Sequence, residues 1–116
     1  MTTEPEYASA IAESILQSFN TGDYAAYSEY FDEAMKKAMP EVAFQQTAAL
    51  IHDKVGEYQS KAFASVETED IYTVVIYRAK FSQEQWGVTV RIVFLETDDN
   101  VFVSGLWFDS PNLRAK

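Results

Sequence analysis

The sequence contains no cysteine and a single histidine, His52, in 116 residues. Without cysteine the chain can form neither a disulfide framework nor a thiolate nucleophile, and the usual zinc sites built from cysteine and histidine are excluded. The acidic segments 67–70 and 98–100 supply oxygen ligands but lack the twelve-residue spacing of a calcium-binding loop. We therefore predict no metal site and no cofactor.

Basic residues are also scarce, since nine lysines and arginines stand against eighteen acidic residues and give a net charge of −9. The average field therefore repels nucleic acid and anionic lipid, and no basic cluster offsets it locally. No window approaches the roughly 18 apolar residues of a membrane span, and the first residues have neither the basic nor the apolar region of a signal peptide. We expect no nucleic-acid or membrane partner, and a cytoplasmic location.

The composition is that of a folded domain, because 47% of the residues are hydrophobic and 15% are aromatic. A chain of 116 residues with this content can bury a core, but it has no room for a second one. We predict one domain that spans residues 1–116.

Apolar residues recur at helical spacing in the first half of the chain. The stretch 3–22 opens with the spacing of a capping box and ends in Asn-Thr-Gly, which tolerates a left-handed cap. Asp23 is a good N-cap for a second helix, and Asp32 can cap a further turn. A third helix is predicted over 40–55, with proline at its first position and glycine just after its end.

After residue 56 the pattern changes to the alternation of β-strands, in which every second residue is apolar. Short polar links at 82–84 and 98–100 favour hairpins, which make neighbouring strands antiparallel. The fold class is therefore α+β, with the helices packed on a four-stranded antiparallel sheet. The predicted strands are 58–66, 71–81, 86–95 and 101–108.

The two faces of this sheet follow from the lengths of the turns. Two-residue turns set Val75 opposite Val90 and Phe94 opposite Val103. This register places four large apolar residues on the face under the helices, although a one-residue change in either turn would exchange the two faces. These residues are Trp86, Val88, Ile92 and Trp107.

The opposite face combines apolar residues with two arginines and is too apolar to be bare in water. We predict that a second copy of the chain covers it. The expected residues of this homodimer interface are Arg78, Arg91, Val93, Phe102, Leu106 and Phe108.

This order of helices followed by a curved antiparallel sheet resembles the nuclear-transport-factor-2-like superfamily, whose sheet wraps around its helices as a cone. The chain also contains four short motifs, which are Phe19-Asn20-Thr21-Gly22-Asp23-Tyr24, Tyr30-Phe31-Asp32-Glu33-Ala34-Met35, Val55-Gly56 and Ser104-Gly105-Leu106. In these motifs it is similar to an uncharacterised prokaryotic family of that superfamily, which carries only a domain-of-unknown-function label. The resemblance covers nearly the whole chain, but its motifs are helix caps, aromatic core positions and turns, so it implies fold more strongly than activity.

The interpretation that we favour is a non-enzymatic binding or dimerisation domain. A cone of this kind would enclose an aromatic pocket for a small apolar or amphipathic molecule, or for a segment of protein. The residues expected to line the pocket are Tyr27, Phe31, Trp86 and Trp107.

Two other interpretations remain open, and the first is a cofactor-free isomerase or lyase of the ketosteroid-isomerase type. Such a site needs a carboxylate base in an apolar pocket and a tyrosine or protonated acid that stabilises an enolate. Tyr27, Tyr30 and Asp32 have the right residue types, whereas His52 and Asp53 diverge by roughly 100° on a helix and are poor partners. No residue is assigned as catalytic. The second is a purely structural dimer whose pocket is filled by its own side chains.

Overall fold

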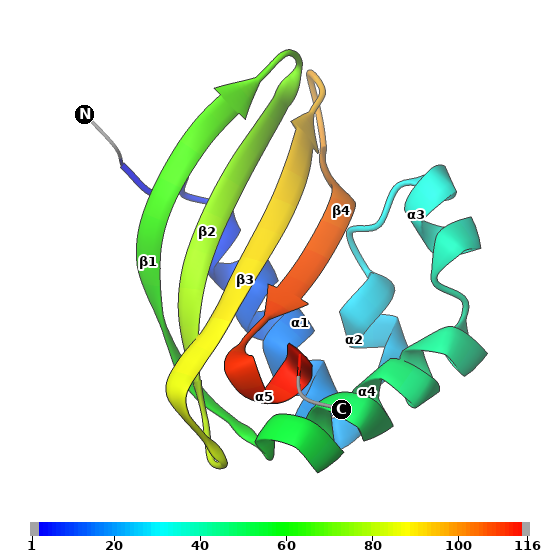
Figure 1. Cartoon of the computed structure of the whole chain (residues 1–116). Helices are drawn as coiled ribbons and strands as arrows, with labels where there is room; N and C mark the ends of the chain where they lie inside the picture. Colours follow the sequence, from blue (N-terminus) through cyan, green and yellow to red (C-terminus); the bar gives the residue numbers. More distant parts are fainter. Residues whose placement is uncertain (1–2, 115–116) are drawn as a thin grey trace.

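The computed structural model describes residues 3–114, in which four helices precede a curved four-stranded antiparallel sheet (Figure 1). The strands follow the order β1-β2-β3-β4, so the predicted α+β class and antiparallel sheet are confirmed. The elements are α1 (Ala8–Thr21), α2 (Tyr24–Ser28), α3 (Glu33–Ala38), α4 (Glu41–Val55), β1 (Tyr58–Glu69), β2 (Tyr72–Phe81), β3 (Glu84–Glu96), β4 (Val101–Asp109) and α5 (Pro111–Arg114).

Local capping residues set most of the helix ends. The Asp23 side chain accepts a hydrogen bond from the Ala26 N–H at 3.2 Å, and Asp32 accepts one from the Met35 N–H at 2.8 Å, as predicted. Each cap satisfies a backbone donor that the first turn of a helix leaves free. At its far end α4 stops at Gly56, which has a φ of 84° and donates its N–H to the His52 carbonyl.

The start of α1 differs from the prediction, because the helix begins at Ala8 and not at the capping box. The preceding residues are held by contacts from the sheet. The Tyr77 hydroxyl donates to the Glu4 carboxylate, and the Tyr7 ring packs edge-on against Phe94 with centroids 5.1 Å apart. These long-range contacts hold the segment beside the sheet, where it forms a single turn closed by the Ala8 N–H and the Pro5 carbonyl at 3.1 Å.

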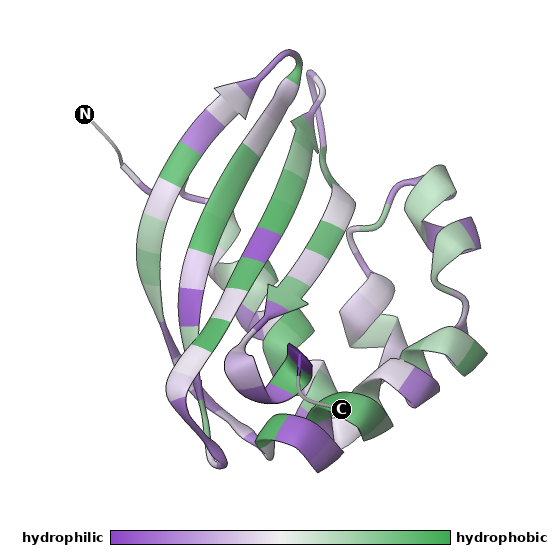
Figure 2. Cartoon of the chain, in the orientation of Figure 1, coloured by the Kyte–Doolittle hydropathy of each residue, from purple (hydrophilic) through white to green (hydrophobic). Residues whose placement is uncertain are grey.

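The core lies between the inner face of the sheet, which curves around α1, and the helices α1 to α4 (Figure 1). Figure 2 shows hydrophobic residues along the middle of β2 and β3 and hydrophilic residues at the turn that joins them. Burial of these side chains is the main favourable term for the fold. The inner face of the two central strands consists of Val75, Tyr77, Ala79, Val88, Val90, Ile92 and Phe94.

The predicted pairing of Val75 with Val90 is wrong by two residues, because Val75 pairs with Ile92. A bulge just after the β2–β3 turn causes the shift: three residues of β3 stand opposite one of β2, and Gly87 takes a φ of 78°. A shift of two preserves the alternation, so Val75 stays inside. Trp86 lies within the bulge and is 64% exposed, so it does not lie under the helices as predicted.

A second bulge interrupts β4. Phe94 pairs with Val103 as predicted, but the next pair is Val93 with Gly105, so Ser104 is an extra residue. A shift of one residue reverses the two faces of the strand from that point on. Every face assigned to the end of β4 is therefore inverted relative to the prediction.

The inversion corrects three residues. Leu106 and Phe108 were expected in an interface on the outer face, but they pair with inward-facing residues of β3, and Phe108 packs edge-on against Phe19 at 5.2 Å. Trp107 was expected inside and instead lies on the outer face, 53% exposed, with the Arg91 guanidinium 5.0 Å from its ring centre.

The second bulge forms where the α2–α3 connection crosses the edge of β4. The Val103 N–H donates to the Tyr30 carbonyl at 2.6 Å, and the Asp32 N–H donates to the Val103 carbonyl at 3.2 Å. The Ser104 hydroxyl then donates to the Asp32 carboxylate at 2.6 Å. The extra residue is thus held by contacts from a segment about 70 positions earlier in the chain.

Candidate ligand-binding groove

An apolar groove of about 300 Å³ lies between α4, the end of β4 and α5. One wall is formed by α4, the opposite wall by β4, and Leu113 of α5 closes one end. No acidic residue and no histidine lines it among residues 3–114. The other lining residues are Tyr27, Met39, Thr47, Leu50, Ile51, Leu106, Trp107 and Phe108.

Tyr27 is the polar residue buried most deeply in this groove, and only 1% of it is exposed. Its ring packs against Phe44 at a centroid distance of 4.4 Å and against Phe31 at 5.0 Å. Its hydroxyl has no hydrogen-bond partner among the residues that the structure describes. Burial, with a smaller contribution from Tyr24, raises the pKa of Tyr27 well above its usual range, so the hydroxyl stays protonated. One neutral, unused hydrogen-bond donor therefore lies buried behind the surface of the groove.

Tyr24, the neighbouring tyrosine of α2, has a hydroxyl that does find a hydrogen-bond partner. The Tyr24 hydroxyl donates to the carbonyl of Met39, a residue that lines the groove, at 2.8 Å. The two tyrosine rings are close, with centroids 6.5 Å apart. One hydroxyl of the pair is thus used by the fold and the other is not.

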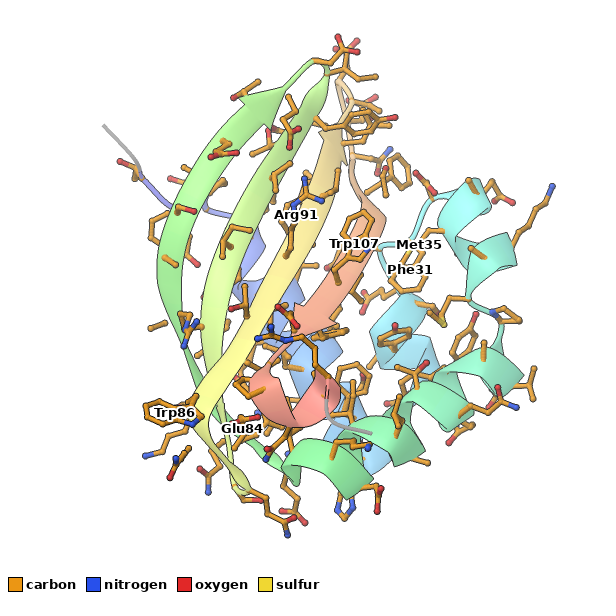
Figure 3. All side chains as sticks on the ribbon, viewed as in Figure 1. Phe31, Met35, Glu84, Trp86, Arg91 and Trp107 are labelled. Atoms are coloured by element: carbon orange, nitrogen blue, oxygen red, sulfur yellow. The ribbon has the colours of Figure 1, made fainter. Side chains whose placement is uncertain are left out.

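The end of the groove depends on α5, which the sequence interpretation missed. The Ser110 hydroxyl caps this helix by accepting the Leu113 N–H at 3.1 Å, and the Glu84 carboxylate accepts the Asn112 N–H at 2.9 Å. Figure 3 shows Glu84 beside α5. The Ser-Pro pair at 110–111 is a helix-start signal that could have revealed α5.

Glu84 is a buried carboxylate, 3% exposed, whose role is to hold α5. Burial alone would raise its pKa, but hydrogen bonds from the Asn112 backbone, the Ser110 side chain and the Trp86 backbone outweigh it and keep the pKa of Glu84 below its ordinary value. The ionised form is therefore the one that fixes α5 to the start of β3.

The four residues predicted to form a pocket do not come together. Tyr27 and Trp107 line the same groove, but Phe31 is 2% exposed and borders a separate hollow beside α3. Trp86 projects from the sheet beside the β2–β3 turn and does not line the groove (Figure 3). Two bulges that sequence reasoning missed account for the position of both tryptophans.

Except for Tyr27, the residues weighed as a catalytic set lie away from the groove. Both oxygens of Asp32 accept hydrogen bonds, one from the Met35 N–H and one from Ser104. Tyr30 is 37% exposed and does not line the groove. His52 lies on the surface with its Nε2 3.9 Å from the Glu57 carboxylate. The arrangement thus offers a donor for binding but no base beside it.

The outer face of the sheet carries the remaining predicted residues. Arg91 pairs with Glu69 at 3.0 Å across β2, and Arg78 donates to the Thr89 hydroxyl at 3.1 Å. Val93 and Phe102 are half-buried on this face. Within residues 3–114 no group of acidic residues or histidine could hold a metal ion, and no helix is long and apolar enough to cross a bilayer.

A helical layer followed by a curved antiparallel sheet that encloses α1 defines the nuclear-transport-factor-2-like, or cystatin-like, class of α+β folds. The sequence profile of a family described as "Protein of unknown function (DUF3887)" matches residues 12–106, and the chain belongs to that family. A search of curated proteins finds no match.

Three solved structures share this fold at low sequence identity. A cystatin-like domain of unknown function from Nostoc punctiforme is 13% identical, with a TM-score of 0.59 over 85% of this chain and 72% of its own. A variant chain named for NTF2 is 14% identical, with a TM-score of 0.57 over 88% of this chain and 96% of its own. Bd1075 of Bdellovibrio bacteriovorus is 14% identical, with a TM-score of 0.52 over 89% of this chain and 40% of its own. Likeness at this level concerns the fold alone.

Proposed function

We propose that this protein is a non-enzymatic binding module, and that the groove between α4, β4 and α5 accepts a small amphipathic molecule with one hydrogen-bond acceptor. The observation that carries the proposal is the unpartnered hydroxyl of Tyr27, a buried residue that lines the groove. Buried hydroxyls nearly always have a partner, and one left without it costs about 1–3 kcal/mol. A ligand that displaces the side chains over this hydroxyl and brings an acceptor to it would recover this free energy.

The chemistry of the walls supports an uncharged ligand. A volume of about 300 Å³ lies at the small end of the range for ligand pockets. Apolar side chains form most of the lining, and a carboxylate or ammonium group placed there would lose its hydration without gaining a counter-ion. A ketone, ester or ether joined to an alkyl chain or ring fits both the donor and the walls.

The alternative of an isomerase or lyase has less support. Proton abstraction needs a base within hydrogen-bond reach of the substrate, and the part of the groove formed by residues 3–114 contains none. A tyrosine donor alone can bind a carbonyl oxygen without turning the substrate over. Binding therefore accounts for the site with fewer requirements than catalysis.

Native mass spectrometry of the purified protein, under gentle and then denaturing conditions, is the direct search for a bound molecule. A matched pair of probes, 2-decanone and decane, then isolates the hydrogen bond. For each protein the measured quantity is the Kd for decane divided by the Kd for 2-decanone. This ratio should be about 2- to 12-fold larger for the wild-type protein than for the Tyr27→Phe variant, as expected for one neutral hydrogen bond.

Tyr24→Phe is the control, because the Tyr24 hydroxyl is already used by the Met39 carbonyl. This variant should keep the wild-type preference for the ketone. Equal discrimination by the wild-type and Tyr27→Phe proteins, or no binding of either probe, would refute the proposed role of the groove.

A further inference from the structure

We propose that a hollow beside the β2–β3 turn binds a small organic acid in which one carboxylate is joined to a planar ring. This basic hollow has a volume of about 630 Å³ and shares no lining residue with the groove, so the inference does not depend on the ligand proposed there. Arg78 and Lys80 line the hollow and bind the carboxylate. The exposed indole of Trp86, which also lines it, binds the ring.

The two cations lie on one face of β2. Arg78 and Lys80 are two positions apart and both project to the outer face of the sheet, the side turned away from α1, with about 6.6 Å between their Cα atoms. Both are exposed, and neither forms an ion pair within residues 3–114. Eighteen acidic residues stand against nine basic ones in this chain, so two neighbouring cations without a carboxylate are unexpected. The pair is therefore open to an anion from outside the chain.

The strands on either side of β2 do not compensate these charges. Ala62 of β1 and Thr89 of β3 stand opposite Arg78, and Ser60 of β1 stands opposite Lys80. All three side chains are small and uncharged. A ligand that approaches the outer face here meets both cations without displacing a larger side chain of the neighbouring strands.

The bulge at the start of β3 fixes the position of the Arg78 guanidinium. Its Nη1 donates to the Thr89 hydroxyl at 3.1 Å, and its Nη2 donates to the Trp86 carbonyl at 2.5 Å. Gly87 lies directly beside it, since a Cβ at this position would be 3.5 Å from Nη2. Arginine has five N–H donors, so these two bonds leave three for a ligand. Because the side chain is already held, it loses less conformational freedom when an anion binds.

Trp86 supplies the apolar part of the hollow. It projects from the sheet beside the β2–β3 turn and is 64% exposed (Figure 3). The same residue gives its carbonyl to Arg78 and its side chain to the lining, so the ring and the cation are linked through one bulge. An indole stacks on other planar rings with an offset. The hollow therefore suits a ligand that has a ring next to its negative charge.

One carboxylate, Glu84, also lines the basic hollow, but it is 3% exposed and its oxygens are used by the fold. They accept the Asn112 N–H at 2.9 Å and the Trp86 N–H at 3.3 Å. Arg78 and Lys80 are the other charged groups among the described lining residues. The surface that a ligand meets thus carries two positive charges, while the negative charge lies buried beneath it.

The charge of the whole chain restricts the ligand to a small one. The net charge is −9, and the acidic turns at 67–70 and 98–99 lie at the other end of the sheet (Figure 1). A nucleic acid or an anionic membrane would extend beyond the hollow and be repelled by the rest of the surface. A molecule confined to the hollow is governed by the nearest charges, because the Debye length is about 8 Å at physiological salt.

Three probes separate the contribution of the charge from that of the ring. 2-Naphthoate has both, 2-naphthamide has the ring alone, and acetate has the charge alone. The readout is the indole N–H signals of Trp86 and Trp107 in ¹H–¹⁵N NMR spectra, assigned with a Trp107→Phe variant; these are the two tryptophans of the chain. 2-Naphthoate should shift the Trp86 signal along a saturable curve with a Kd below about 1 mM, and each of the other probes should bind at least about tenfold more weakly.

Substitution of the cations tests their role. Lys80→Gln removes a charge from an exposed side chain and should raise the Kd of 2-naphthoate about 2- to 5-fold. Arg78→Gln removes the fixed guanidinium and should raise it by about tenfold or more. Lys37→Gln is the matched control, because it makes the same change of charge at an exposed position of α3, and it should bind 2-naphthoate like the wild type.

Four results would overturn the proposal or a part of it. The absence of a saturable shift of the Trp86 signal, or a shift confined to Trp107, would rule out the basic hollow as the site. Equal affinity for 2-naphthamide would refute recognition of the carboxylate, and equal affinity for acetate would refute recognition of the ring. A Lys80→Gln protein that binds 2-naphthoate as tightly as Lys37→Gln does would refute the cation pair.

Discussion

Replacing Tyr27 by phenylalanine should make the free protein more stable, which is unusual for a change at a residue that is 1% exposed. The substitution removes one oxygen atom and leaves the ring, whose neighbours include Phe44 at 4.4 Å and Phe31 at 5.0 Å. The removed hydroxyl has no partner among the described residues, so the variant avoids a desolvation cost of about 1–3 kcal/mol. The lower figure is the safer one, because the space left by the oxygen is not refilled.

The size of the effect can be stated as a shift in melting temperature. The entropy of unfolding is roughly 2.1 cal/mol/K per residue, which for a chain of 116 residues gives about 4 °C for each kcal/mol. Tyr27→Phe should therefore raise Tm by about 4 °C. The Tyr24→Phe variant loses a hydrogen bond to the Met39 carbonyl and should lower Tm by a similar amount.

Differential scanning calorimetry and urea denaturation of the three proteins provide the test. The two variants differ from the wild type by one oxygen each, on the same short helix, so opposite signs of ΔTm isolate the state of each hydroxyl. The slope of the urea transition should stay unchanged, which shows that the comparison concerns stability alone. A Tyr27→Phe protein that melts below the wild type would show that the hydroxyl is satisfied in the folded state and would refute the reasoning.

Other substitutions test the remaining parts of the site. Because the pKa of Glu84 is lowered in the folded protein, its contribution to stability is present above the ordinary pKa of 4.5 and is lost as the pH falls below that value. Between about pH 5 and pH 3 the Tm of the wild-type protein should therefore fall more than the Tm of the Glu84→Gln variant. Gly105→Ala places a Cβ 2.7 Å from the Trp107 ring, so it should lower the free energy of unfolding by about 1–3 kcal/mol and shift the tryptophan fluorescence spectrum. An unchanged spectrum would contradict this prediction. Asp32→Ala removes the cap of α3 and the acceptor of the Ser104 hydroxyl, so it should lower the free energy of unfolding in chemical denaturation by about 1–3 kcal/mol. Asp23→Ala removes a helix cap alone and should lower it by about 1 kcal/mol.

The sequence was sufficient to predict those features that depend on neighbouring residues. Asp23 and Asp32 cap their helices within three positions, and the period of two in β2 and β3 appears directly as inner and outer faces. These elements could be predicted because each cause lies within one turn or one strand of its effect.

The bulges could not be predicted in the same way, and they decide the site. The extra residue in β4 is held by Asp32 and Tyr30 from the other half of the chain, which no local pattern reveals. As a result Trp107 and Leu106 exchanged faces between prediction and structure. Tyr27 was correctly expected to lie inside, but its missing hydrogen-bond partner is a property of packing and not of spacing.

The extra residue Ser104 also determines how this chain can change in length. Loss of one residue at the tip of the β3–β4 turn, in the exposed segment 97–100, would shorten a loop and leave both faces of β4 as they are. Loss of Ser104 would remove the bulge and join Val103 directly to Gly105, so that Leu106, Trp107 and Phe108 keep their pairing and their faces while the contact with Asp32 is lost. An alignment of this chain with a relative that lacks the bulge must therefore open its gap at Ser104, because an alignment without the gap would pair core positions with surface positions along the rest of the strand.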